Sequence, residues 1–187
     1  MTGVVSNKIL SKDEVERAVE EVVDLAASGN VRVALAGGVA MQLYRSDRFT
    51  KDVDFVAGSS VPGLEVEKTL TFGGYSSKTP SGVPVDIILR SDDYRDLYDF
   101  ALDAAEDSGL RTAAGNVLLV ISPACLAAMK LAASREKDLE DLRKLVELGL
   151  VGAETREVTK SFLGKYAARE LDSIVEETKW LMERGKR

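Results

Sequence analysis

Two short segments of this chain carry aspartates at positions where a β-strand usually carries apolar side chains. Asp52 and Asp54 alternate with apolar residues in DVDFVA (52–57), and Asp86 lies among β-branched residues in VPVDIIL (83–89). Aspartate is disfavoured inside strands, so its repeated use there limits where these strands can lie in a fold. Alternate residues of one strand face the same side, which places the Asp52 and Asp54 backbones about 7 Å apart on one face. If the second strand neighbours the first, Asp86 joins that face.

Three carboxylates on one face repel one another and raise one another's pKa unless a cation neutralises them. A set of ligands made only of oxygen atoms suits Mg²⁺ or Mn²⁺. The alternative interpretation, a capped or ion-paired residue at a strand edge, explains one such acid better than three together. We therefore predict that Asp52, Asp54 and Asp86 hold Mg²⁺ or Mn²⁺.

A pair of glycines follows another strand-like segment. Residues 31–36 (VRVALA) predict a short strand, and Gly37-Gly38 leads into VAMQLYR, which suits a short buried helix. Glycine lets a ligand approach the backbone closely, and the free N–H groups of a helix start favour phosphate. A turn required only for packing is the alternative. Because the glycines precede the acidic strands, phosphate-binding amides and a metal site together predict a nucleoside-triphosphate site.

The composition excludes several kinds of chemistry. The chain has no histidine, which removes the Ser-His-Asp triad, the Cys-His pair and the usual catalytic zinc site. Cys125 is the one cysteine, so we expect a buried thiol in a reducing compartment. The net charge of −6 argues against a protein that coats nucleic acid, and no apolar run approaches the roughly 18 residues of a membrane span. We expect a cytoplasmic protein without a membrane partner.

Strand-like segments precede helical ones along the chain. Ser11 and Glu14 form the signature of a helix start, and Gly29 follows the end of that helix. Residues 58–82 are rich in Gly, Ser and Pro, which predicts a surface excursion with a weak hairpin strand at 66–72. The other predicted elements are a helix with a solvated acidic face at 92–107, a strand pair around 111–120, and helices at about 123–134, 137–148, 154–164 and 167–184.

This order of elements predicts an α/β (α+β) fold in two parts. Residues 1–121 would form a mixed sheet with flanking helices, and residues 122–187 would form a helical region packed on it. Trp180, near the end of the last predicted helix, is expected in the core together with neighbouring apolar residues.

Three motifs carry a resemblance to a known superfamily. Residues 35–38 (LAGG), 52–54 (DVD) and 85–87 (VDI) resemble the signature of the polymerase-beta-type nucleotidyltransferase fold, a glycine turn followed by Asp-x-Asp and a later Asp. The finer spacing across 37–54 resembles the minimal AbiEii-like toxins of type IV toxin–antitoxin systems. The segment KLAASREKDLEDL at 130–142 is similar to part of their helical half.

The resemblance implies an enzyme that transfers a nucleoside monophosphate from an NTP to a hydroxyl acceptor with Mg²⁺ or Mn²⁺ and releases pyrophosphate. The acceptor would be an RNA 3′ end such as that of tRNA, a protein side chain or a small molecule. The toxin-like members also imply an antitoxin protein as partner. The implied catalytic residues are Asp52, Asp54, Asp86 and Lys130, and the implied nucleotide contacts are Gly37, Gly38, Arg48, Thr50 and Lys130.

Other interpretations stay open at this point. An antibiotic-modifying nucleotidyltransferase would need an acidic pocket for a cationic drug, which the helix at 92–107 could line. A catalytically silent NTP-binding or protein-interaction module could use the same fold, although it would have no reason to keep mutually repelling carboxylates. Lys130 is either a triphosphate contact or a solvated helix lysine. The alternative to a functional role is a set of intramolecular ion pairs for Arg135, Lys137, Asp138 and Asp141.

Overall fold

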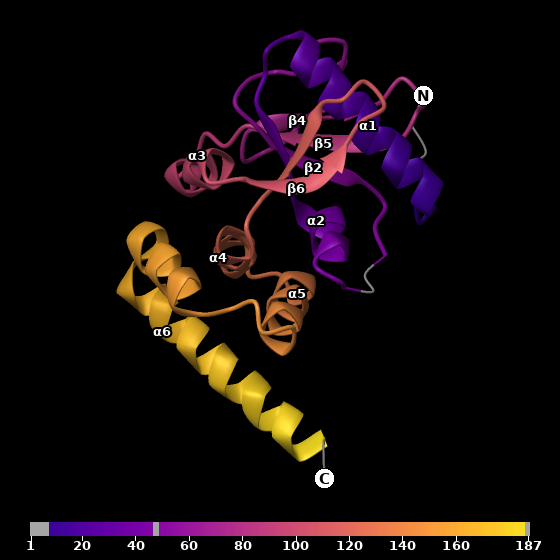
Figure 1. Ribbon diagram of the computed structural model, residues 1–187. Helices are drawn as coiled ribbons and strands as arrows, with labels where there is room; N and C mark the ends of the chain where they lie inside the picture. The colour runs from indigo at the N-terminus through magenta and orange to yellow at the C-terminus, as the bar shows by residue number, and fades with distance from the viewer. Residues whose placement is uncertain (1–7, 47–48, 186–187) are drawn as a thin grey trace. The chain divides into compact units, whose positions relative to one another are not determined.

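The computed structural model describes residues 8–46 and 49–185, which contain a seven-stranded mixed sheet and six helices (Figure 1). The strand order across the sheet is β3-β4-β5-β2-β1-β7-β6. The sequence predicted a mixed sheet with flanking helices, followed by a helical region. The observed elements confirm this fold class. The strands are β1 (Val33–Leu35), β2 (Val53–Ala57), β3 (Lys68–Thr69), β4 (Gly74–Lys78), β5 (Pro84–Ile88), β6 (Glu106–Arg111) and β7 (Val117–Val120).

The described chain divides into two compact units. A sheet unit contains the residues up to Leu89 together with Asp107–Val120, and a helical unit contains Arg90–Glu106 together with the chain from Ile121 onward. The sheet unit holds the helices α1 (Lys12–Ser28) and α2 (Gly37–Leu43). The helical unit holds α3 (Arg95–Asp103), α4 (Pro123–Ala133), α5 (Glu136–Glu147) and α6 (Ala153–Gly185).

This division differs in one segment from the boundary that the sequence predicted between 1–121 and 122–187. Residues 90–106 belong to the helical unit, because α3 packs against α4 and buries Leu97. The rings of Phe100 and Phe162 also meet at a centroid distance of 4.9 Å, which joins α3 to α6. Tertiary packing of this kind joins segments that lie far apart along the chain.

The first helix begins and ends where the sequence predicted. The Ser11 hydroxyl accepts a hydrogen bond from the Glu14 backbone N–H, and the Glu14 carboxylate accepts one from the Ser11 backbone N–H at 2.8 Å. Hydrogen bonds from Lys8 and from the Ser11 backbone lower the pKa of Glu14 to about 2. Gly29 caps the other end, and α1 packs on β1 and β2. Its buried residues are Val15, Ala18, Val19, Val22, Val23 and Ala26.

The prediction of a surface excursion over 58–82 is wrong for its second half. The predicted hairpin is present, since β3 pairs antiparallel with β4. However, β4 also pairs antiparallel with β5 over its whole length. Tyr75 in β4 is buried at 4% exposure. Gly74 has a φ of +94°, and a side chain there would overlap the Ile87 carbonyl oxygen, so glycine is required by a close backbone approach within the sheet. The glycine content that indicated a loop thus belongs to a strand.

The acidic helix predicted at 92–107 is shorter than expected. It ends at Asp103, because Glu106 already begins β6. The predicted strand pair is present as β6 and β7, and the Gly115 backbone N–H donates to the Thr112 carbonyl at 2.9 Å in the turn between them. The Thr112 hydroxyl donates to the Asp24 carboxylate at 2.6 Å, which fixes this turn on α1.

The helices that follow Ser122 match the predicted boundaries closely. Ser122 caps α4 by accepting a hydrogen bond from the Cys125 backbone N–H at 3.3 Å, with Pro123 in the first turn. Cys125 is buried as expected, and burial raises the pKa of its thiol. Gly164 has a φ of +86° and a ψ of 175°, so α6 consists of two helical stretches that meet at the predicted break.

Trp180 does not lie in the core. Half of its surface is exposed, and the Arg184 guanidinium lies 4.1 Å from the centre of its ring. The buried face of this part of α6 is formed instead by Ala168, Leu171 and Thr178. None of the helices in the described ranges has the length and apolar character that a membrane span requires.

Candidate functional site

Two of the predicted acids lie on adjacent parallel strands. β2 and β5 pair so that Asp54 is directly opposite Asp86. Side chains opposite each other on neighbouring strands leave the same face, with the strands about 4.8 Å apart. Because β5 neighbours β2, Asp86 and Asp54 lie on the same face of the sheet, as predicted. Both side chains are half-buried, and like charges directly opposite each other disfavour strand pairing.

Gly37 lies against one of these acids. It opens α2 with a φ of +57°, a conformation that side chains disfavour. A Cβ on Gly37 would overlap the carboxyl group of Asp54, so the glycine leaves the space that this carboxyl group occupies. The Ala36 backbone N–H also donates to the Asp54 carbonyl at 2.8 Å. Backbone conformation and side-chain space thus fix the start of α2 directly beside Asp54.

A serine extends the acidic pair along the same face. β4 pairs with β5 so that Ser76 is opposite Asp86, and the half-buried side chains of Ser76, Asp86 and Asp54 form a row across three strands. Ser77 points to the other face, where its hydroxyl donates to the Glu65 carbonyl at 2.6 Å. Sequence reasoning missed Ser76, because nothing in that Gly- and Ser-rich stretch showed that it forms a strand beside β5.

Asp52 and Thr50 lie immediately before β2. The Thr50 hydroxyl donates to the Asp52 carbonyl at 2.8 Å and lies 3.4 Å from the Asp52 carboxylate oxygen Oδ1. The Leu10 backbone N–H donates to the Thr50 carbonyl at 3.0 Å, so this segment is held from both sides. The structure places Thr50 in contact with Asp52, and its predicted contact with a nucleotide stays a prediction. Arg48 lies outside the described residues.

Asp54 and Asp86 could together hold a divalent cation, but the predicted group of three carboxylate ligands is not seen among the described residues. Within residues 8–46 and 49–185, no three His, Cys, Asp or Glu side chains are grouped closely enough to hold a metal ion. Magnesium is commonly bound through only one or two carboxylates, with phosphate and water oxygens completing its shell. Asp54 and Asp86, opposite each other and half-buried, meet that requirement. The participation of Asp52 stays a prediction.

Lys130 is buried in the helical unit, so its interpretation as a solvated helix lysine is wrong. Its ammonium pairs with Asp138 at 3.1 Å and with Asp141 at 2.7 Å, and its side chain is 8% exposed. Arg135, which is largely exposed, also pairs with Asp138. The interpretation of Arg135, Asp138 and Asp141 as intramolecular ion pairs is confirmed. Lys130 lies in α4, and the two aspartates lie in α5. The ion pairs therefore connect these two consecutive helices.

The charges of the network set the protonation of Asp138. Burial raises the pKa of this carboxyl group, but the hydrogen bond from Arg135 and the charge of Lys130 outweigh burial and leave the pKa below its ordinary value. Asp138 is therefore ionised at neutral pH and holds the start of α5 against Lys130 in α4.

Comparisons with known proteins establish the fold. No family model and no curated protein matches the sequence. Among solved structures, a crystal structure of an antigenic nucleotidyltransferase-like protein from Paracoccidioides brasiliensis aligns with a TM-score of 0.55 and 21% identity, over 90% of this chain and 95% of that one. The solution structure of the antibiotic-resistance factor ANT(2'')-Ia aligns with a TM-score of 0.56 and 14% identity, over 86% of this chain and 97% of that one.

At these identities, the similarity shows the fold alone. The chain has the fold of the nucleotidyltransferase superfamily, as the three sequence motifs indicated. The residues matched to those motifs include Asp54, Asp86 and Gly37, which the structure brings together in the sheet unit.

The contact between Gly37 and Asp54 can be tested by a double-mutant cycle. Gly37→Ala is expected to destabilise the protein more than Gly82→Ala. Both residues have a positive φ, for which a side chain costs about 1–2 kcal/mol, but a Cβ on Gly82 meets no atom within 4 Å. Adding Asp54→Ala to Gly37→Ala should recover about 1 kcal/mol, measured by urea denaturation. Equal costs at Gly37 and Gly82, or strict additivity with Asp54→Ala, would show that the two residues do not compete for space.

The buried lysine gives a second prediction. Lys130→Met should lower the free energy of unfolding by about 3–5 kcal/mol, because it leaves the buried Asp138 and Asp141 without their shared cation. The matched control is Lys144→Met on α5, whose partner Glu147 is exposed, and it should change stability by less than about 0.5 kcal/mol. Similar, small losses for both variants in urea denaturation would contradict the structural role of Lys130.

Proposed function

We propose that this protein is a metal-dependent nucleotidyltransferase that transfers a nucleoside monophosphate from an NTP to a hydroxyl acceptor. The observation that carries the proposal is the direct register of Asp54 and Asp86 beside the glycine start of α2. The nucleotidyltransferase fold supports it. So does the position of three residues that match the superfamily motifs, since Asp54 lies opposite Asp86 and against Gly37. A sheet that needed only stability would have little reason to oppose two carboxylates.

In this reaction, the acceptor oxygen attacks the α-phosphorus of the NTP. A new P–O bond forms, the bond between the α-phosphorus and the bridging oxygen breaks, and pyrophosphate leaves with that electron pair. Asp86 would take the proton of the acceptor hydroxyl, and Ser76 lies opposite it on the neighbouring strand. The backbone N–H groups of Gly37 and Gly38 would bind the terminal phosphates.

Asp54 and Asp86 would hold Mg²⁺ or Mn²⁺, with Asp52 as the further predicted ligand. When bound, such a cation supplies positive charge to the triphosphate oxygens. The protein's own contribution is to keep the Asp54 carboxylate in place, through the space left at Gly37 and the backbone hydrogen bond from Ala36. Positioning and electrostatic stabilisation account for most of the catalysis in phosphoryl transfer.

Lys130 was predicted to contact the triphosphate. Its ammonium is already paired with two buried carboxylates, which favours a structural role in the helical unit. A contact between Lys130 and the triphosphate stays a prediction, and we do not make the proposed reaction depend on it.

The acceptor that we propose first is an RNA 3′ end, such as that of tRNA, or a protein side-chain hydroxyl. This choice rests on the resemblance of the chain to AbiEii-like toxins, which also suggests an antitoxin protein as partner. A second candidate is a cationic antibiotic. It is favoured by the similarity of the fold to that of the antibiotic-resistance factor ANT(2'')-Ia and by the exposed aspartates around α3.

Transfer of label from each α-labelled NTP tests the proposal directly. Purified protein with Mg²⁺ should transfer label to cellular RNA, to protein or to a cationic antibiotic. Asp54→Asn and Asp86→Asn should each lower the rate at least ~10²-fold, as losing one preorganised electrostatic contact does. Asp13→Asn, which changes an exposed aspartate in the first turn of α1, is the matched control and should keep full activity. Binding of NTP with Mg²⁺ but no transfer to any acceptor would instead identify a silent NTP-binding module.

A further inference from the structure

A cavity lies in the sheet unit, apart from the acidic face. Its volume is about 670 Å³, and it is bounded by α1, α2, β1 and the β6–β7 hairpin. None of the predicted metal ligands or phosphate-binding glycines lines it. A cavity of this size, mostly apolar and with a few polar groups, has the character of a site for a small organic molecule.

Apolar side chains form much of the cavity wall. Val19 from α1, Leu35 from β1 and Val39 from α2 are buried and form part of its lining. Leu43 and Leu110 also line it but are 38% and 51% exposed, so these two apolar side chains remain in contact with water at the rim. Covering them with a ligand would remove that apolar surface from water, which stabilises a complex.

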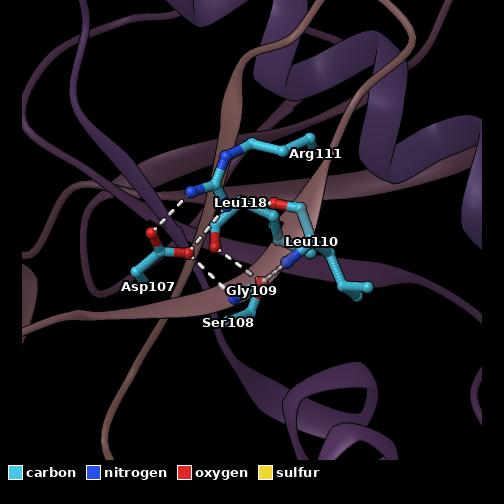
Figure 2. Close-up of polar contacts among 6 residues, drawn as sticks. All are labelled: Asp107, Ser108, Gly109, Leu110, Arg111 and Leu118. Carbon is cyan, nitrogen blue, oxygen red and sulfur yellow. Dashed lines mark hydrogen bonds and ion pairs between the residues drawn. The ribbon is translucent and has the colours of Figure 1, made fainter.

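Hydrogen bonds made by its neighbours in β6 hold Leu110 in place. Gly109 has a φ of +79°, and its backbone N–H donates to the Asp107 carboxylate at 2.8 Å. The same carboxylate accepts two hydrogen bonds of 2.8 Å from the Arg111 guanidinium, and the Ser108 hydroxyl donates to the Leu118 carbonyl at 2.8 Å. Figure 2 shows Arg111 turned toward Asp107, with Leu110 pointing away from that pair. This wall of the cavity is therefore preorganised.

Some charged side chains that line the cavity form ion pairs with described residues, and one does not. The Arg111 guanidinium is paired with Asp107, and Lys12 is paired with Glu16 at 3.4 Å. Glu20 lies one helical turn after Glu16 on α1 and lines the same cavity, but its carboxylate makes no hydrogen bond or ion pair with any described residue. Among the described residues that line the cavity, the charge left without a partner is therefore negative.

We propose that this cavity binds a small organic cation, with its apolar body against Leu43 and Leu110 and its ammonium group beside Glu20. The apolar walls supply most of the affinity, and Glu20 selects the charge of the ligand. This proposal does not rest on nucleotidyl transfer, since it uses neither the acidic face nor the glycine start of α2.

Three probes that share one apolar body test the proposal. We suggest 6-phenylhexylamine, 6-phenylhexan-1-ol and 6-phenylhexanoate, titrated into the full-length protein and followed by amide chemical shifts. The amine should saturate below ~1 mM, shift residues around Leu43 and Leu110, and bind about three-fold more tightly than the alcohol, as expected for one exposed ion pair. The carboxylate should bind more weakly than both.

Matched variants separate the two parts of the site. Glu20→Gln should abolish the preference for the amine over the alcohol, whereas Glu65→Gln, an exposed glutamate away from the cavity, should leave it unchanged. Leu110→Ser should weaken all three probes several-fold, whereas Val66→Ser, at a similarly exposed apolar position outside the cavity, should not.

Three outcomes would overturn the proposal. The first is the absence of saturable binding of the amine, and the second is equal affinity for all three probes in the wild-type protein. The third is a shift of the same cavity residues when the protein alone is concentrated, which would assign this surface to a second copy of the chain.

Discussion

The direct opposition of Asp54 and Asp86 on β2 and β5 is the constraint on which the account of this protein depends. Like charges across neighbouring strands disfavour the pairing that the sheet requires, yet this pairing lies at the centre of the strand order. The surrounding structure is arranged around the pair. Gly37 leaves space for the Asp54 carboxyl group, the Ala36 backbone holds the Asp54 carbonyl, and Ser76 lies beside Asp86.

Much of the sheet unit could be predicted, because its signals are local. Ser11 and Glu14 lie three residues apart and form the same capping box in the structure as in the sequence pattern. The alternation of acids with apolar residues predicted β2 and which of its side chains lie on the same face. The glycines between β1 and α2 likewise marked a position where the backbone needs a positive φ at Gly37.

The features that sequence reasoning missed depend on contacts between distant residues. Ser76 joins the acidic row only through the strand order, and Gly74 indicated a loop although it serves a close approach inside the sheet. The partners of Lys130 lie on the next helix, so the sequence did not show that this lysine is buried in an ion-pair network. Trp180 was expected in the core together with its apolar neighbours on the last helix, but the buried face of α6 passes through Leu171 and Thr178 instead.

Paramagnetic relaxation by Mn²⁺ tests the central claim most directly. With substoichiometric Mn²⁺ and a non-hydrolysable NTP analogue, the account predicts that the amide signals of Gly37, Asp54 and Ser76 broaden first, and that excess Mg²⁺ restores them. The same experiment with Asp54→Asn should show no such broadening. Broadening confined to the exposed aspartates around α3, or broadening near Gly37 that persists in Asp54→Asn, would show that the opposed carboxylates do not form the metal site.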